Sequence, residues 1–350
     1  MLTSPRWRKT ILIVLACLLV ILALTVWRWR DSHFDWARFF ATLTSVNWYW
    51  LTLSVLLILL SYVGRALRWE VMLRPIRPHP SFWNLCSATV IGFTAIVILG
   101  RPGELVRPYL IALKERVPFS SQMAAWFLER ILDTLVVLLI FGFALTRTPA
   151  QGLAPGSPLQ WVLKAGGYIM AFICVLCVLF LFLFRNFSEG AQLRILSALT
   201  FLPERHYKRI ETTLTAFAAG MQATRDRSIL VLLLGYTVIE WVVIVAAYFF
   251  MFRAFSATAG FPLVDALVFV GFVALGSIVQ IPGIGGGMQV AAVVVLTELF
   301  GLSIESATGM ALMIWVLSFV SIVPFGLLFA FHEGLNWRKF KNLAQEVPAS

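Results

Sequence analysis

Hydrophobic residues occupy long unbroken stretches of this chain, and within them they do not alternate with polar residues. A transmembrane α-helix needs about 20 consecutive apolar residues, whereas the strands of a membrane barrel alternate. Because no water reaches the bilayer core to pair with backbone groups, helices and closed barrels are the two structures that span it. The pattern therefore predicts an all-α, polytopic integral membrane protein. We expect six full crossings, near residues 10–27, 48–69, 124–146, 161–184, 229–252 and 306–331.

Two further apolar stretches each contain a break. Residues 82–113 are interrupted by Gly100-Arg101-Pro102-Gly103-Glu104 and Arg107-Pro108, and residues 263–300 by Pro282-Gly283-Ile284-Gly285-Gly286-Gly287. Proline removes a helical hydrogen bond and glycine frees the backbone, so each stretch is predicted to form two half-length helices. Such a pair returns the chain to the side it entered, as a re-entrant hairpin or as two thin crossings. The length and charges of residues 103–113 favour re-entry.

The two breaks also indicate an internal repeat. Gly92-Phe93-Thr94-Ala95 precedes the first break much as Gly271-Phe272-Val273-Ala274 precedes the second. One repeat would cover residues 48–146 and the other residues 229–331, with a linking helix at 161–184. Because one extra crossing separates the copies, they must have opposite orientations in the membrane. Inverted repeats with broken helices are typical of many secondary transporters.

Basic residues predict the orientation of the chain, because Lys and Arg accumulate in cytoplasmic flanks. Arg6, Arg8 and Lys9 precede an apolar run that is too long for a signal peptide, so residues 1–30 are predicted to form a retained transmembrane helix. The segment 185–228 and the tail 332–350 are also expected in the cytoplasm, as is the end of the second helix with Arg65, Arg68, Arg74 and Arg77. Both termini are then cytoplasmic. Helical spacing within residues 204–227 predicts an amphipathic helix on the cytoplasmic surface, or a helix that docks a partner.

Composition agrees with a membrane protein and narrows its chemistry. Of the 350 residues, 60% are hydrophobic and 13% charged, with a mean hydropathy of +0.88; soluble domains are about 25% charged. The net charge of +11 is spread over the ends of apolar runs, which argues against nucleic acid as a partner. The four cysteines and four histidines do not form a ligand set, so we expect no metal and no cofactor.

Charged residues in the first break are the leading candidates for a binding site. Arg101, Glu104 and Arg107 follow an apolar run, and an unpaired charge at membrane depth costs about 2.5–3.5 kcal/mol. In one interpretation they mark a cytoplasmic loop and neutralise one another. In the other, the two arginines and the backbone at Gly103 bind an anionic group such as a lipid phosphate.

Charges on two of the full helices are further candidates. Glu129, Arg130 and Asp133 lie in the helix that follows the first break, with the two acids four residues apart on one face. They form a charged helix end, or they pair with the break: Arg130 with Glu104, and Glu129 or Asp133 with Arg101 or Arg107. Glu240 lies about halfway along an apolar helix, where a functional role is the default interpretation.

The second break is rich in glycine but does not match a nucleotide-binding loop. Pro282, Gly283 and Gly285 belong to neither a G-x-G-x-x-G nor a Walker A sequence, and the segment is not expected to connect a strand to a helix. Such glycines let backbone approach backbone, or a substrate approach backbone groups. Gln289 follows as an uncharged donor and acceptor at membrane depth.

Four motifs spread over nearly the whole chain carry a family resemblance: Arg65-Ala66-Leu67-Arg68-Trp69, Gly100-Arg101-Pro102-Gly103-Glu104-Leu105-Val106-Arg107, Glu129-Arg130-x-x-Asp133 and Pro282-Gly283-Ile284-Gly285. With them the chain resembles the flippase-like transmembrane domain of lysylphosphatidylglycerol synthase and the stand-alone membrane proteins related to it. In that family the domain is taken to move a polar lipid between leaflets, next to a soluble aminoacyl-transferase domain in the full synthase. This chain has no such domain before Ser350, so the resemblance does not imply lysyl transfer.

Two departures limit what the resemblance implies. The family usually carries a Glu shortly after the second Pro-Gly, where this chain has Gln289, and an Arg in the final helix, which is replaced near Ile314-Trp315. The resemblance therefore does not extend to proton or cation coupling through the second break. The first break keeps the residues of an anionic-group site.

Together these features predict a lipid flippase-like transporter, not an enzyme. Arg101 and Arg107 would hold the anionic group, Glu104 would fix the arginines, and Glu240 and Gln289 would line the facing side of a cavity between the repeats. The alternatives are a secondary transporter of a small polar solute or ion, and a non-transporting partner of a lipid-modifying enzyme that docks on residues 185–228. Membrane lipids are the expected partners. The sequence leaves the lipid, the energy source and the oligomeric state open.

Overall fold

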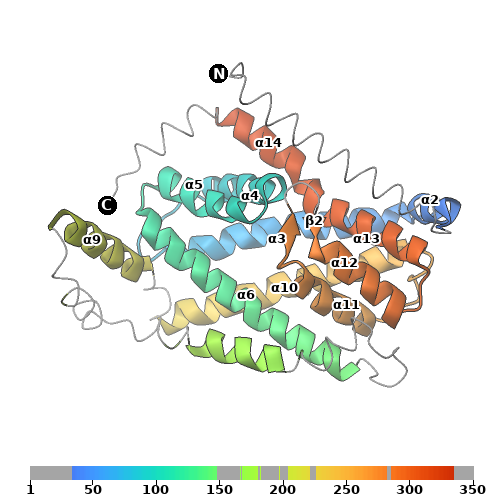
Figure 1. Ribbon diagram of the computed structural model, residues 1–350. Helices are drawn as coiled ribbons and strands as arrows, with labels where there is room; N and C mark the ends of the chain where they lie inside the picture. Colours follow the sequence, from blue (N-terminus) through green and yellow to red (C-terminus); the bar gives the residue numbers. More distant parts are fainter. Residues whose placement is uncertain are drawn as a thin grey trace, which may run out of the picture.

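The computed structural model describes residues 34–147, 166, 168–179, 182, 197, 204–220, 226–281 and 285–334. Within them the chain is mostly helical, with one antiparallel pair of two-residue strands and short connecting turns (Figure 1). Four of the described helices are long and apolar enough to cross a membrane: Trp48–Leu73, Phe82–Leu99, Ser228–Ala254 and Ile304–His332. Shorter apolar helices accompany them, so the predicted all-α polytopic class is confirmed. The expected crossing at 10–27 and the tail beyond residue 334 lie outside the described residues. Within the expected crossing at 161–184, the structure describes a shorter apolar helix over Tyr168–Leu179.

The first predicted repeat folds as long helix, broken pair, long helix. Its elements are α3 (Trp48–Leu73), α4 (Phe82–Leu99), the 3-10 turn η1 (Arg101–Leu105), α5 (Val106–Glu115) and α6 (Phe119–Arg147). Gly100 ends α4 with φ 71°, a conformation that favours glycine, and Pro102 lies in the first turn of η1. The sequence predicts a half-length helix before the break, whereas α4 has 18 residues. No charged residue, proline or other interruption occurs between Phe82 and Leu99, so the helix continues to the break.

The second predicted repeat has the same order of elements. It comprises α10 (Arg227–Ala254), α11 (Leu263–Gly276), the strands β1 (Gln280–Ile281) and β2 (Gly285–Gly286), α12 (Gly287–Val294), α13 (Ile304–Phe319) and α14 (Val323–His332). The sequence predicts one helix over 306–331, whereas a 3-10 turn at Val320–Ile322 separates α13 from α14. Pro324 explains this difference, because proline has no N–H to donate to the preceding turn.

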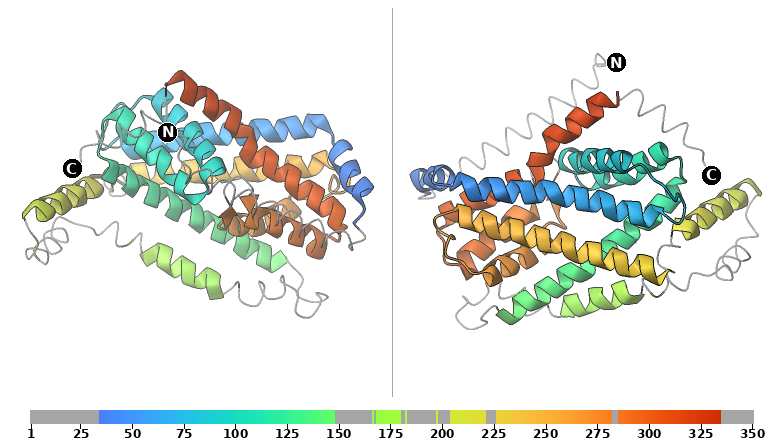
Figure 2. Two further views of the ribbon diagram at one scale, coloured as in Figure 1. Left: turned by 45° about the horizontal axis from the view of Figure 1, so that its top comes forward. Right: turned by 180° about the vertical axis from the view of Figure 1, so that it is seen from behind.

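The long first helices of the two segments lie side by side and antiparallel (Figure 2). The backbone N–H of Asn47, at the start of α3, donates to Ala254 O at the end of α10 over 2.8 Å. Further along, Ser54 Oγ donates to Ala247 O, also over 2.8 Å. The start of α3 therefore meets the end of α10, and the contact runs along both helices.

Each broken pair packs on the last long helix of the other segment. Phe272 of α11 meets Phe141 of α6 edge to face, with ring centroids 5.1 Å apart. Thr94 of α4 packs against Gly326 of α14, where a Cβ would lie 1.9 Å from the threonine Oγ1. The two segments are interleaved and share contacts across their whole length.

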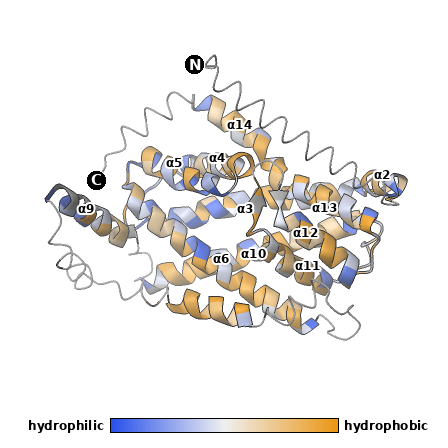
Figure 3. Cartoon of the chain, in the orientation of Figure 1, coloured by the Kyte–Doolittle hydropathy of each residue, from blue (hydrophilic) through white to orange (hydrophobic). Residues whose placement is uncertain are grey.

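Two apolar cores result, and the charged residues gather where the cores meet. On α3, the buried positions from Leu51 to Tyr62 belong to the larger core and those from Ala66 to Leu73 to the smaller one. Hydrophilic residues accordingly appear on α3 and α6 near the centre of the bundle, between largely hydrophobic helices (Figure 3). Arg65 lies at this boundary on α3.

Smaller helices complete the described part of the chain, among them the apolar helix Tyr168–Leu179. The amphipathic helix predicted within residues 204–227 forms as α9 (Glu204–Gly220), and its Phe217 contacts Phe127 of α6 with ring centroids 6.5 Å apart. The helix α2 (Trp36–Thr44), which the sequence patterns do not predict, begins at an Asp35 cap and packs on α13. Phe39 of α2 is buried there against Gly309.

Close packing of the first break gives a test of the fold. A Cβ on Gly103 would lie 2.4 Å from the backbone oxygen of Ala95, so Gly103→Ala must separate η1 from α4. We expect Gly103→Ala to lower the stability by about 1–3 kcal/mol, measured by thermal unfolding in detergent. Gly64→Ala on α3 is the control, because no atom lies within 4 Å of its Cβ. Equal melting temperatures for the two variants would contradict this packing.

Candidate functional site

Seven charged side chains from four helices meet at the boundary between the two apolar cores. They come from α3, α5, α6 and α10, and only α5 and α6 are adjacent in the sequence. Their members are joined by ion pairs within 4.0 Å: Arg65, Arg68, Arg107, Glu129, Arg130, Asp133 and Glu240. We call this group the charge cluster.

Glu129 of α6 is at the centre of the charge cluster. Its fully buried carboxylate accepts hydrogen bonds from Arg68 over 2.5 Å, from Trp69 Nε1 over 2.6 Å and from Arg107. Arg130 lies 3.5 Å away and Arg65 4.0 Å away. A buried carboxylate is tolerated only when it is paired and hydrogen-bonded, and Glu129 meets both conditions through α3 and α5.

Arg68 links Glu129 to the remaining acids. It is fully buried and donates to Asp133 Oδ1 over 2.7 Å and to Thr237 Oγ1 over 3.2 Å, and its Nη1 lies 3.4 Å from Glu240. Glu240 in turn pairs with Arg65 at 2.8 Å. The glutamate in the middle of α10 therefore has two arginine partners, both from α3.

Aromatic rings cover the guanidinium groups on the apolar side. Arg107 lies over the ring of Trp69 at 4.7 Å and that of Phe93 at 5.3 Å, and Arg65 lies over Phe93 at 4.9 Å. Cation–π contacts of this kind stabilise a desolvated arginine by roughly 2 kcal/mol. Phe93 thus packs against the charge cluster, although the sequence indicates only its place before the first break.

The structure changes the role expected of Arg65 and Arg68. Sequence reasoning assigned both to a cytoplasmic flank, whereas they lie in the charge cluster with side chains 14% and 0% exposed. Their spacing of three residues on one helical face was the available signal, since Glu240 on an apolar helix requires a cationic partner. Four arginines face three carboxylates in the cluster.

Of the pairs expected between the first break and α6, one forms as predicted. Glu129 pairs with Arg107. The ion pairs of Arg130 are made with Glu129 and Asp133 of its own helix, whereas Glu104 pairs with Arg101. The expected Arg130–Glu104 pair is replaced because Asp133 lies one helical turn from Arg130, at 3.2 Å.

Arg101 connects the two breaks. Its guanidinium donates to Ser277 O over 2.9 Å and to Ile278 O over 2.6 Å, just beyond the C-terminal end of α11. The carbonyl end of a helix carries partial negative charge and attracts cations. The second break also closes on itself, since Gln289 Oε1 accepts from the Gly286 backbone N–H at 2.6 Å. Pro282 and Gly283 lie outside the described residues, and Gly285 is in β2.

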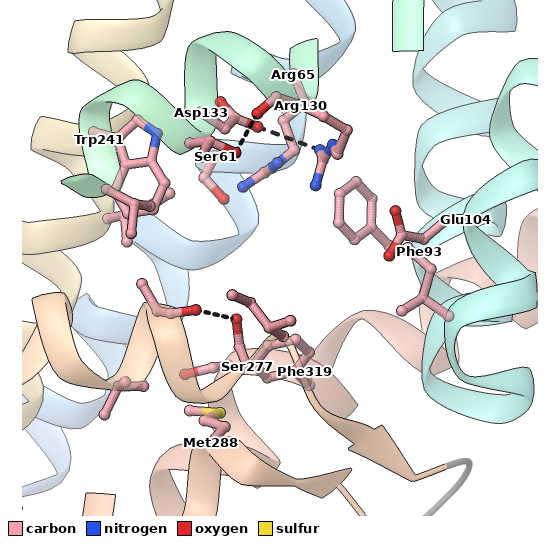
Figure 4. A pocket seen from close by; sticks show the side chains of 18 of the residues that line it. Ser61, Arg65, Phe93, Glu104, Arg130, Asp133, Trp241, Ser277, Met288 and Phe319 are labelled. Atoms are coloured by element: carbon pink, nitrogen blue, oxygen red, sulfur yellow. Dashed lines mark hydrogen bonds and ion pairs between the residues drawn. The ribbon is translucent and has the colours of Figure 1, made fainter. Parts of the chain in front are cut away.

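A cavity of about 410 Å³ lies between these elements. Figure 4 shows Arg65, Arg130 and Asp133 on one side of it and Ser277 and Met288 on the other. The charged residues that line it are Arg65, Arg101, Glu104, Arg107, Arg130 and Asp133. Glu240 and Gln289, which the sequence places on the facing side of a cavity, are not among the residues that line this one. Glu240 pairs with Arg65 behind the wall, and the Gln289 side chain caps the start of α12.

A family model for the lysylphosphatidylglycerol synthase TM region matches residues 11–326 of the chain. The chain belongs to this family. It is also similar to the glycosyltransferase AglD of Haloferax volcanii, at 25% identity over 149 residues, which is 42% of this chain and 23% of that protein. No solved structure matches the chain. The family and the apolar helices together make this a lipid-related, multi-pass membrane protein.

The site offers no obvious place for a metal ion. Among the described residues, no group of three or more His, Cys, Asp or Glu side chains is placed to bind one. The carboxylates that come together, Glu129, Asp133 and Glu240, are all engaged by arginines. What the arrangement can do chemically is attract a negative charge, because its cationic groups are in excess.

The central pairing predicts an unequal effect of two similar substitutions. Glu129→Gln leaves Arg68 and Arg107 without their shared carboxylate, so we expect a loss of about 3–5 kcal/mol in unfolding free energy. Glu70→Gln, on the same helix as Arg68, removes only the 3.1 Å pair with Arg74, whose side chain is 48% exposed, and should cost less than about 1 kcal/mol. Thermal unfolding in one detergent compares them. Equal losses would show that the cluster does not hold the helices together.

Proposed function

We propose that this protein is a lipid transporter that binds the anionic head group of a lipid in the central cavity and moves it between leaflets. The observation that carries the proposal is the charge of the cavity wall. Four arginines line it against two carboxylates, Glu104 and Asp133. Both carboxylates are already paired, Glu104 with Arg101 and Asp133 with Arg68. The lining arginines are paired as well, but with Arg68, Glu129 and Glu240 behind the wall included, five arginines face four carboxylates. A negative group that enters the cavity therefore meets one uncompensated positive charge.

Arg107 supports this site from the interior. The residue is only 4% exposed and lines the cavity, and its Nη1 has no hydrogen-bond partner in the part of the chain that the structure describes. A buried donor without a partner is costly, and a phosphate oxygen in the cavity would satisfy it. Arginine–phosphate contacts are among the stronger charge-assisted hydrogen bonds.

The size of the cavity fits a head group and leaves the acyl chains outside. Small-molecule sites enclose roughly 300–1,000 Å³, and this cavity has about 410 Å³. Phe93, Ile96, Trp126 and Leu138 supply an apolar part of its wall. In a flippase-like mechanism the chains remain in the bilayer while the charged group crosses within the protein. A lipid substrate also agrees with the lipid synthase region that gives the family its description.

We further propose that residues 48–146 and 229–331 are inverted repeats. Three observations support this arrangement: the same order of elements, the antiparallel contact of α3 with α10, and the exchange of broken pairs between the segments. A two-fold axis that relates antiparallel helices exchanges the two faces of the membrane. Rocking of one repeat against the other would then expose the cavity alternately to each leaflet. Arg101 bridges the two breaks, so its hydrogen bonds to the second break must break and re-form during that motion.

The anionic site predicts that Arg101→Gln slows transport of an anionic lipid. We expect about a tenfold fall in the rate for labelled phosphatidylglycerol in liposomes, and a smaller change for phosphatidylcholine, because one charge-assisted contact is lost. The rate is measured as the loss of accessibility to a membrane-impermeant reductant.

Arg74→Gln is the matched control for this experiment. The Arg74 side chain is 48% exposed and pairs with Glu70 four residues away, as Arg101 is 46% exposed and pairs with Glu104 three residues away. Only Arg101 lines the cavity. If Arg101→Gln moved phosphatidylglycerol at the wild-type rate with unchanged selectivity, the proposed site would be wrong.

The inverted arrangement predicts that the C-terminal ends of α3 and α10 lie on opposite faces of the membrane. His79→Cys and Ser256→Cys, both at exposed positions, are introduced separately into a protein without its native cysteines. A membrane-impermeant maleimide should label His79→Cys from the cytoplasmic face of the cell membrane and Ser256→Cys from the outside. Labelling of both from one face would refute the inverted repeat.

A further inference from the structure

The central cavity contains a second set of polar groups, and these are uncharged. Besides the arginines, its wall presents hydroxyl and indole groups at Ser61, Tyr62, Thr134, Trp241, Tyr248 and Ser318. Figure 4 shows Ser61 and Trp241 near Arg65 and Arg130, with Glu104 on the opposite side of the cavity. The cavity therefore places neutral polar groups next to the cationic ones.

These neutral groups include both donors and acceptors. The Ser61 hydroxyl donates to Ile58 O over 2.6 Å and the Thr134 hydroxyl to Arg130 O over 2.6 Å, so both oxygens keep lone pairs for an incoming donor. Trp241 Nε1 is a buried donor with no hydrogen-bond partner among the described residues. A ligand hydroxyl donates and accepts, and it matches this mixture. An ammonium group only donates, and a phosphate oxygen only accepts.

The same wall disfavours a cationic head group. Asp133 and Glu104 are its two carboxylates, and each is held by arginine, so an ammonium group entering the cavity would find no free counter-charge among the described residues. It would also be repelled by the four arginines. The Phe93 ring, an aromatic surface that suits a cation, already lies under Arg65 and Arg107.

We propose that the lipid head group bound in this cavity is a phosphodiester linked to a neutral polyhydroxyl group, such as glycerol or a sugar, and not an aminoacylated, cationic one. The phosphodiester contacts the arginines, and the hydroxyls contact Trp241, Ser61 and Thr134. Trp241 acts as a specificity-determining residue through its indole N–H. This inference rests on the proposed anionic-lipid site and names the class of head group that it takes.

Competition between lipids tests the preference directly. Purified protein in detergent binds phosphatidylglycerol that carries a fluorophore on one acyl chain, and unlabelled lipids displace it. Phosphatidylglycerol should displace the probe at a concentration about three- to tenfold lower than the concentration at which phosphatidylethanol does. Phosphatidylethanol has the same phosphodiester but lacks the hydroxyl groups. Lysylphosphatidylglycerol should displace the probe less effectively than either of these lipids. Displacement by lysylphosphatidylglycerol at the concentration of phosphatidylglycerol would overturn the inference.

Trp241→Phe keeps the aromatic ring and removes the N–H donor. This substitution should weaken the binding of phosphatidylglycerol about three- to tenfold and leave the binding of phosphatidylethanol unchanged, because only the contact with a hydroxyl group is lost. Trp83→Phe is the matched control, since Trp83 is 61% exposed and does not line the cavity. An equal effect of Trp241→Phe on both lipids, or no effect on either, overturns this inference while the anionic site stands. If no anionic lipid binds the wild-type protein, the proposed function fails as well.

Discussion

The pairing of Glu129 with Arg68 and Arg107 is the interaction on which the rest of the structure depends. A carboxylate buried between apolar helices requires cationic partners, and these arrive from α3 and α5, which the chain could otherwise pack in several ways. Arg68 then fixes α10 through Glu240. One buried acid therefore decides which faces of four helices point inward. The helices are held by directional contacts, because apolar packing alone does not distinguish a neighbouring helix from lipid.

The cavity follows from the same charges. Arginines outnumber carboxylates in the cluster by one, and Arg107 keeps one buried nitrogen without a hydrogen-bond partner among the described residues. Filling that space with side chains would leave the surplus charge buried and uncompensated. A polar, open space between two tightly packed apolar cores is thus the arrangement that the residues allow. It is also the arrangement that a transported head group needs.

Glycine and proline explain how two broken helices come close enough to enclose this space. Gly276 and Gly287 face each other where α11 crosses α12, and a Cβ on either would lie about 2.5 Å or less from a backbone oxygen of the other. Gly103 brings η1 equally close to α4. With the breaks packed this tightly, the side chain of Arg101 can span from one to the other. Motion of one segment relative to the other must therefore change the hydrogen bonds of Arg101.

The sequence by itself determined the membrane environment, the helical class, the two breaks and most of the charged candidates, because hydropathy and the cost of charge in lipid are properties of single segments. It also offered Glu129 with Arg107 as one of several possible pairs between the first break and the helix that follows it. The tertiary structure alone decided that Arg65 and Arg68 belong to the charge cluster, that Glu240 pairs with Arg65 and Gln289 caps α12, and that Trp241 lines the cavity. These outcomes depend on which helices become neighbours, and contacts between distant segments leave no periodic signal along one chain.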